Sequence, residues 1–223
     1  MTRLLVAAIV ATGLPDAQNK YKRICVTRAV YDFRGDRLAP SSPSFDTMSF
    51  CIACGTKAVH RIPDGDHLPR LVCPACGHIH YENPRLIVGC IAEWDKRILL
   101  CKRAIEPRLG YWTLPAGFME NGESTCQAAI RETWEEAGAR VRIDAAFAMI
   151  NIATINQVHL FYRGKMADAA FSAGEESLEV RLFAPTEIPW EEISFHSVRH
   201  CLEAYLSERD HGRYSFHELS LAP

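Results

Sequence analysis

The sequence predicts a mixed α/β fold that is preceded by a small module held together by a metal ion. Two Cys-x-x-Cys pairs, Cys51/Cys54 and Cys73/Cys76, are separated by eighteen residues, a spacing typical of a small metal site. From residue 85 onward, apolar runs of strand length alternate with a strongly helical segment at residues 123–137. Alternation of this kind favours a sheet covered by helices.

The composition limits the class of protein. The chain has 223 residues, of which 48% are hydrophobic and 23% charged, enough for one catalytic core and a small appendage. No apolar run approaches the roughly 18 residues that a spanning helix needs, so we expect no membrane partner. A formal net charge of −2 argues against a protein that coats nucleic acid, so we expect no nucleic-acid partner either.

Residues 1–47 differ in charge from the rest of the chain. They carry seven Lys and Arg against four Asp and Glu, whereas the remaining residues carry eighteen against twenty-three. Arg3 and the apolar residues 4–10 fit a secretory signal, and an organelle transit peptide is disfavoured by three aspartates. A third interpretation, which we favour, is that the working chain starts at Met48 and residues 1–47 form a poorly structured extension. Metal-binding thiolates need a reducing compartment, so we expect a cytoplasmic location.

The four cysteines predict a structural zinc site in residues 48–82. Four thiolates in two Cys-x-x-Cys pairs suit tetrahedral zinc. Gly55 and Gly77 directly follow the two pairs, and a tight knuckle needs the positive φ that glycine adopts without steric cost. Free thiols, a disulfide pair and an iron–sulfur site are the alternatives. A module this short builds little hydrophobic core, so a metal cross-link would supply the missing stability.

The elements beyond the module can be placed in order. Strands are expected at 86–92 and 98–101, joined by a turn at Asp95-Lys96, and further strands at 139–143, 148–154, 158–162 and 178–183. The helix at 123–137 has Ser124 and Gln127 spaced as a capping box and Gly138 as its end. A second helix is expected at 197–207.

The first helix carries three carboxylates on one face. Glu132, Glu135 and Glu136 are related by i, i+3 and i+4 spacing. Like charges at this spacing destabilise a helix unless a cation compensates them. Oxygen ligands without cysteine or histidine suit Mg²⁺ or Mn²⁺. The alternative is a solvated acidic face. An apolar stripe on the opposite face favours the metal site; it consists of Ala128, Ala129, Ile130, Thr133 and Ala137.

These residues form a recognisable motif. Residues 117–138 resemble the complete Nudix box, whose fixed positions are Gly117, Glu123, Arg131, Glu132, Glu135, Glu136 and Gly138. Residues 111–117 (YWTLPAG) are similar to the segment that leads into this box. Residues 80–84 (HYENP) and 103–108 (RAIEPR), after a zinc ribbon, resemble the ADP-ribose/FAD pyrophosphatase branch. NADH pyrophosphatases also join a ribbon to a Nudix domain, but they carry an SQPWPFP-type stretch that this sequence lacks.

The resemblance implies a fold and a set of domains. We expect a Nudix α/β/α sandwich with a mixed sheet at residues 83–207, after a zinc ribbon at 48–82 and before a C-terminal tail at 208–223. The implied reaction is hydrolysis of a nucleoside diphosphate linked to another group, X, with release of AMP. FAD or ADP-ribose is the expected substrate, ahead of NADH.

The resemblance also assigns roles to residues. Glu132, Glu135 and Glu136, with the Gly117 carbonyl, are expected to bind Mg²⁺ or Mn²⁺ and to serve catalysis. Arg131, which stays charged, is expected to hold the glutamates in place together with Glu123. The general base is either a box glutamate or one of Glu175, Glu176 and Glu179.

Substrate contacts are less closely defined by the sequence. We expect them from Arg108, Tyr111 and Gln157. Trp112, Phe118 and Tyr162 could also contact an aromatic ring, but we expect Trp112 and Phe118 to be core residues.

A second class of function remains open at this point: a zinc-ribbon ligand sensor or nucleic-acid-binding regulator that uses a Nudix fold without catalysis. Two features favour the enzyme. All box glutamates are present, and residues 51–76 carry Lys57, Arg61 and Arg70 against Asp64 and Asp66, which is only weakly basic. The expected partner is therefore a small nucleotide substrate. The ribbon is expected to be a structural cap or a dimer element, so a homodimer is an open possibility.

Overall fold

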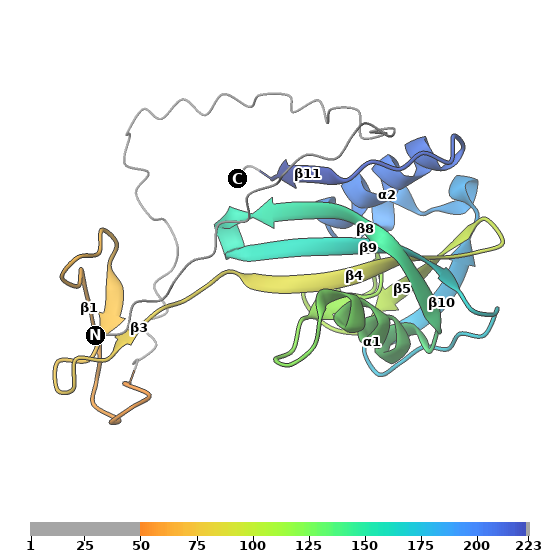
Figure 1. Cartoon of the computed structure of the whole chain (residues 1–223). Coiled ribbons are helices and arrows are strands. Elements are labelled where there is room, and N and C mark those ends of the chain that lie inside the picture. The colour runs from red at the N-terminus through yellow and green to blue at the C-terminus, as the bar shows by residue number, and fades with distance from the viewer. Residues whose placement is uncertain (1–49, 222–223) are drawn as a thin grey trace, which may run out of the picture. The chain divides into compact units, whose positions relative to one another are not determined.

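A computed structural model describes residues 50–221 of the chain (Figure 1). The interpretation of residues 1–47 as a poorly structured extension falls outside these residues. The described part contains a small antiparallel sheet at its start and a larger mixed sheet with two α-helices.

The small sheet belongs to the cysteine module. It consists of β1 (Val59–Arg61), β2 (Arg70–Val72) and β3 (Ile79–His80), paired in that order and antiparallel. The strands are two or three residues long, and β1 is exposed throughout. Short exposed strands bury little apolar surface, so this sheet needs the cysteine cluster for its stability.

The large sheet has the strand order β10-β5-β4-β9-β8-β11. Its strands are β4 (Arg85–Trp94), β5 (Arg97–Arg103), β8 (Val141–Ile152), β9 (Gln157–Met166), β10 (Ser177–Phe183) and β11 (His217–Ser220). Two short strands join its inner part: β6 (Trp112–Thr113) pairs with β5, and β7 (Ala116–Phe118) pairs with β4. The β4–β9 and β11–β8 pairs are parallel and the others antiparallel, which confirms the expected mixed sheet.

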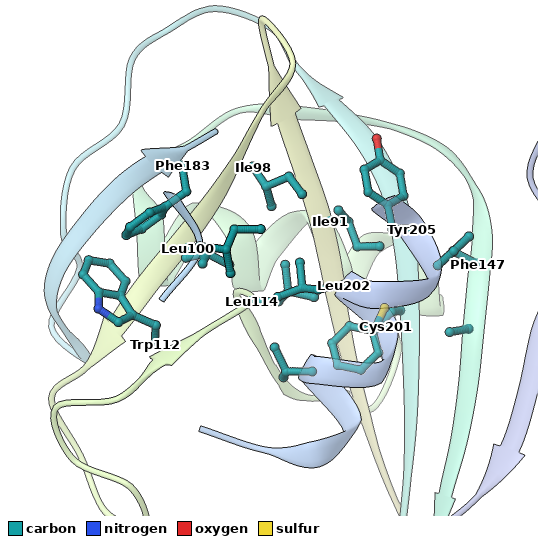
Figure 2. Close-up of a cluster of buried hydrophobic side chains, with 14 of the residues drawn as sticks. Ile91, Ile98, Leu100, Trp112, Leu114, Phe147, Phe183, Cys201, Leu202 and Tyr205 are labelled. Atoms are coloured by element: carbon teal, nitrogen blue, oxygen red, sulfur yellow. The ribbon is translucent and has the colours of Figure 1, made fainter. Parts of the chain in front are cut away.

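The two helices cover opposite faces of this sheet (Figure 1). Helix α1 (Thr125–Ala137) buries Ala128, Ala129 and Ala137 against Val88, Cys90 and other residues of β4 and β5. Helix α2 (His196–Arg209) packs on the other face, where Leu202 and Tyr205 meet Ile91 and Phe147 (Figure 2). Successive side chains of β4 point to opposite faces of the sheet, so this strand contributes to the hydrophobic cluster under each helix. Three 3₁₀ turns complete the described chain: Ala153–Ile155, Pro185–Glu187 and Trp190–Glu192.

The structure differs from the sequence-based expectations at three places. The strands expected at 139–143 and 148–154 are parts of one strand, β8, whose register shifts after Ile143 and Ala146 absorb the irregular apolar pattern. Residues 153 and 154 belong to a 3₁₀ turn instead. Residues 208–223 are more than a tail, because β11 extends the sheet by pairing with β8. Ile130 is 38% exposed and does not join the buried stripe of α1.

A buried charge cluster ties α2 to the sheet. The hydroxyl of Tyr205 donates a short hydrogen bond to Glu93 of β4, and Nζ of Lys165 donates to the other carboxylate oxygen at 2.6 Å. Glu93 is largely withdrawn from solvent, which opposes ionisation. The hydrogen bonds from Lys165 and Tyr205 outweigh this effect and lower its pKa below the ordinary value.

Candidate active site and metal centre

Helix α1 holds the box glutamates, and its two ends are fixed by local sequence. Oγ of Ser124 accepts from the backbone N–H of Gln127, whose side chain accepts from the Ser124 N–H at 2.8 Å, so the predicted capping box is present. Gly138 ends the helix with a φ of 57°, and its N–H donates to the Trp134 carbonyl at 2.8 Å. The two caps therefore fix a helix that contains all three box glutamates.

Glu136 is the most buried carboxylate of the box. It is 8% exposed, and one of its oxygens accepts a 3.1 Å hydrogen bond from the backbone N–H of Ala116. Burial raises the pKa of Glu136 to about 8, and the nearby charges of Glu132 and Glu176 act in the same direction. None of the described Lys or Arg side chains makes an ion pair with Glu136 within 4 Å, so its charge is poorly compensated.

Glu132 fills the space above Gly117. A Cβ placed on Gly117 would lie 2.3 Å from one carboxylate oxygen of Glu132, so no larger residue fits at this position of β7. Glu132 is 8% exposed, and burial raises its pKa despite an ion pair with Arg131. Gly117 thus allows a second buried carboxylate to lie directly against the strand.

Arg131 connects three carboxylates. Its guanidinium donates two hydrogen bonds to Glu123, at 2.7 and 3.1 Å, one to Glu132 at 2.7 Å and one to Glu135 at 2.8 Å. A further bond, of 3.1 Å, reaches the Phe118 carbonyl. Accepting these bonds lowers the pKa of Glu123, and donating them to Glu123, Glu132 and Glu135 raises the pKa of Arg131. A planar fork with five donors suits this task, which lysine could not perform.

The loop between β9 and β10 closes over the C-terminal end of α1. The N–H of Gly174 donates to the Glu136 carbonyl at 3.1 Å, and a Cβ on Gly174 would lie 1.7 Å from the Glu135 carbonyl oxygen. The loop then continues to Glu176, whose carbonyl accepts from Ala104 at 2.8 Å. The charge of Glu176 raises the pKa of both buried box glutamates. Glu176 is therefore the one of the three candidate bases whose charge acts on Glu132 and Glu136.

The expected substrate residues lie on two other segments. Arg108 and Tyr111 belong to the loop between β5 and β6, where the guanidinium carbon of Arg108 lies 5.4 Å from the centre of the Tyr111 ring. Gln157 begins β9 and contacts His159. Among the described residues, no hydrogen bond or ion pair joins these three to the box carboxylates. Trp112 is a core residue, as expected, whereas the core position expected for Phe118 is wrong, because its side chain is 49% exposed.

Arg103 is a residue near the site that received no role from the sequence. Its charge lowers the pKa of Glu136, which partly opposes the effect of burial. Its Nε donates to the Pro107 carbonyl at 2.8 Å, and its guanidinium carbon lies 5.2 Å from the Phe195 ring centre. Its sequence position within residues 103–108 was the available signal, but only folding brings it towards α1.

The four cysteines form a cluster with the geometry of a metal site. All four Sγ atoms lie within 4.8 Å of one another, with Cys51 and Cys76 3.6 Å apart and Cys54 and Cys73 3.5 Å apart. Tetrahedral zinc with Zn–S bonds of about 2.3 Å separates its sulfurs by about 3.8 Å, whereas a disulfide would bring two sulfurs to about 2.05 Å. Gly55 and Gly77 both have a φ of +73°, as the knuckles require. The donor set therefore fits structural zinc.

The donor set on α1 fits a divalent cation that prefers oxygen. Two buried carboxylates with raised pKa values stand beside a third, exposed one, and a cation would compensate all three. In the described residues only the cysteines bring three or more ligand atoms together. One guanidinium nitrogen of Arg131 bridges Glu132 and Glu135.

Comparison with known proteins identifies the family. Residues 49–82 match the zinc-ribbon family described as Nudix N-terminal, and residues 83–201 match the NUDIX domain family. The chain belongs to the Nudix family. The predicted Nudix hydrolase with an N-terminal zinc ribbon is thereby confirmed, and so is its membership of a family of hydrolases that use divalent metals.

Three relatives place the chain within the Nudix family. It is 52% identical to a NUDIX hydrolase from Nitrosomonas europaea of known crystal structure, with a TM-score of 0.76 over 78% of this chain and 99% of that one. It is 34% identical over 117 residues to an NAD-capped RNA hydrolase from Photobacterium profundum, covering 52% of this chain and 42% of the relative. It is 45% identical over 58 residues to an ADP-ribose pyrophosphatase from Methanocaldococcus jannaschii, covering 26% and 34%. The chain thus spans about half or less of the length of these two curated relatives.

The structure also bears on membrane association. Among residues 50–221, no helix of this Nudix protein is long and apolar enough to cross a membrane.

Proposed function

We propose that the chain hydrolyses the diphosphate bond of a nucleoside diphosphate linked to X, with FAD or ADP-ribose as substrate ahead of NADH. Water attacks one phosphorus and the bridging P–O bond breaks. One phosphate stays on AMP and the other stays on X. The observation that carries this proposal is the pair of buried carboxylates, Glu132 and Glu136, held against Gly117 and Ala116 beside the Arg131 ion-pair cluster.

Glu132, Glu135 and Glu136, with the Gly117 carbonyl, are the proposed ligands of Mg²⁺ or Mn²⁺. A bound divalent ion would neutralise the charge of the diphosphate, which the acidic helix would otherwise repel, and would polarise its phosphoryl oxygens. Arg131 then has a positioning role, because its bonds to Glu123 and Phe118 hold it in place while it orients Glu132 and Glu135. Arg103 moderates the negative charge at Glu136.

Glu176 is the proposed general base, ahead of Glu175 and Glu179. Its charge acts on both buried glutamates, and the backbone on either side of it is tied down. Gly174 is bonded to α1, and the Glu176 carbonyl is bonded to Ala104. A carboxylate in this place could accept the proton of the attacking water.

The substrate group X is proposed from the sequence resemblance. Arg108 and Tyr111, which form a cation–π pair on one loop, are proposed as contacts to the phosphate or ribose. The expectation that nucleic acid is not a partner stays a prediction, since several of the relatives that the chain matches are named NAD-capped RNA hydrolases. The possible homodimer also stays a prediction.

The test uses the purified full chain with Mg²⁺, offered FAD, ADP-ribose, NADH and an NAD-capped RNA in parallel, with AMP release as the measurement. We expect Glu136→Gln to abolish the activity, because an amide cannot ionise to bind Mg²⁺ although its oxygen can still accept the Ala116 hydrogen bond. Glu218→Gln is the matched control, because this glutamate is exposed on β11. Tight binding of ADP-ribose without cleavage of any substrate would overturn the catalytic proposal in favour of a sensor.

A further inference from the structure

A chain of hydrogen bonds crosses from α2 to the first residue of β9. Ser197, the second residue of α2, is 1% exposed, and its Oγ lies 3.0 Å from Nδ1 of His159. Nε2 of His159, which is itself buried, lies 3.1 Å from Oε1 of Gln157. A buried chain of this kind fixes the orientation of its last member, Gln157, which is half-buried.

The donors and acceptors of Ser197, His159 and Gln157 can be assigned so that every hydrogen bond runs from Ser197 towards Gln157. With the amide oxygen of Gln157 towards His159, as in this structure, Nε2 of His159 carries the hydrogen and donates it. Burial lowers the pKa of His159 to about 4, so the ring is neutral near pH 7 and its Nδ1 accepts from the Ser197 hydroxyl. The Gln157 amide nitrogen is not used by the chain, and both of its N–H groups stay available to a ligand.

Gln157 shares a face of the sheet with an exposed aromatic ring. Arg85 of β4 pairs with Gln157, and Ile87, two residues further on, pairs with both His159 and Phe118. Paired residues point to the same face, so these side chains lie on the face that α2 covers further along. The guanidinium carbon of Arg85 lies 5.3 Å from the centre of the Phe118 ring, which is 49% exposed.

This face adjoins the box through Phe118. The Phe118 carbonyl accepts from Arg131, and the residue before it is Gly117, which lies against Glu132. The exposed ring of Phe118 and the amide of Gln157 therefore lie on the α2 side of the sheet, and the main chain of Phe118 links that side to Arg131 of the box. Stacking surface and directed hydrogen-bond donors are the combination that recognises a nucleobase.

We propose that Ser197 and His159 are positioning residues that hold the Gln157 amide with its nitrogen towards the ligand, where it donates hydrogen bonds to the nucleobase stacked on Phe118. The identity of the ligand as a nucleotide rests on the function proposed above. The orientation of Gln157 depends only on the hydrogen-bond chain.

The test measures binding of AMP to the full chain by calorimetry in the presence of Mg²⁺. Ser197→Ala removes the hydroxyl that orders the chain, and we expect it to weaken AMP binding about five- to tenfold, as does Gln157→Ala. Ser197→Thr keeps the hydroxyl and should restore binding. In a Gln157→Ala background, Ser197→Ala should cause no further loss, because the group that it orients is gone.

Three results would overturn the proposal. The first is that Ser197→Ala weakens AMP binding by the same factor in the unmodified chain and in the Gln157→Ala variant. The second is that Ser197→Ala lowers the unfolding midpoint but leaves AMP affinity unchanged. Failure of AMP to bind the unmodified chain would also overturn it. If AMP binds with the expected coupling but no substrate is cleaved, the proposed hydrolysis fails and the positioning role stands. If a substrate is cleaved but the effects of Ser197→Ala and Gln157→Ala are independent, the positioning role fails and the proposed hydrolysis stands.

Discussion

Gly117 and Glu132 compete for the same space: a Cβ on Gly117 would lie 2.3 to 2.5 Å from the three atoms of the Glu132 carboxyl group. These atoms belong to a side chain that is 8% exposed and bonded to Arg131, so it has little freedom to move aside. A glycine in strand β7 is therefore a requirement of the carboxylate on α1.

Gly117→Ala should displace Glu132 and lower the rate of diphosphate hydrolysis by about a hundredfold, since displacement by about 1 Å has an effect of that size. The measurement is kcat with ADP-ribose, together with the unfolding midpoint, which should change little. Gly212→Ala is the control, because a Cβ at Gly212 meets nothing within 4 Å and only its positive φ is strained. Unchanged kcat in Gly117→Ala would show that Glu132 does not need its observed position.

Arg131→Lys should lower kcat and raise the Mg²⁺ concentration needed for half-maximal activity by about ten- to a hundredfold, a typical effect of removing a group that orients metal ligands. Lysine keeps the charge but cannot bond Glu123, Glu132 and Glu135 at once. Titration of activity against Mg²⁺ measures both changes. Arg140→Lys, at an exposed arginine paired with Asp168, should leave the titration unaltered. An Arg131→Lys variant with an unchanged Mg²⁺ requirement would contradict the positioning role.

Cys73→Ser should release the zinc and unfold residues 50–82, because the short strands of the ribbon bury too little apolar surface to persist alone. Elemental analysis should find one zinc ion per unmodified chain and less than one in the variant. Limited proteolysis should then cut between residues 50 and 82. Cys126→Ser, outside the cluster, should retain both the metal and the protease resistance. Full zinc content in Cys73→Ser would rule out the four-thiolate site.

His159 should make the free energy of unfolding sensitive to acid. Burial lowers its folded-state pKa to about 4, whereas the unfolded chain takes up a proton near pH 6.5. Since the unfolded state then binds more protons, stability is fully present above pH 6.5 and decreases as the pH falls towards 4, by up to about 1.4 kcal/mol per pH unit.

Urea unfolding at a series of pH values measures this slope. His159→Gln should show a shallower dependence between pH 4 and 6.5, because its amide does not titrate there. His200→Gln is the control, since His200 lies on the exposed side of α2. Equal slopes in the His159→Gln variant and the unmodified chain would contradict the prediction.

Much of the fold was predictable because its signals are local. The capping box at Ser124 and the helix end at Gly138 act over a few residues, and both are present as expected. The Asp95-Lys96 turn is likewise local, with φ values of 45° and 63° at the two residues. Strand β11 was not predictable in this way, because its four residues are stabilised only by pairing with β8, far away in the sequence.

The candidate site also has features that local sequence predicts and features that depend on tertiary packing. Helical periodicity was enough to bring Glu132, Glu135 and Glu136 to one side of α1, but it could not say that two of them are buried and one exposed. The apolar stripe of α1 was wrong at Ile130 because the helix is rotated to bury Glu132 and Glu136 instead. The expected core position of Phe118 was wrong, because its place on β7 leaves its side chain 49% exposed.

The sequence by itself determined the two-part organisation, the two Cys-x-x-Cys pairs, the helix with its caps and the spacing of its carboxylates, because each depends on residues close together in the chain. The tertiary structure alone decided the raised pKa of Glu136, the approach of Glu176 to α1 and the chain from Ser197 to Gln157. Those features arise where distant segments pack together and exclude water, and desolvation and directed hydrogen bonds act only after that packing has formed.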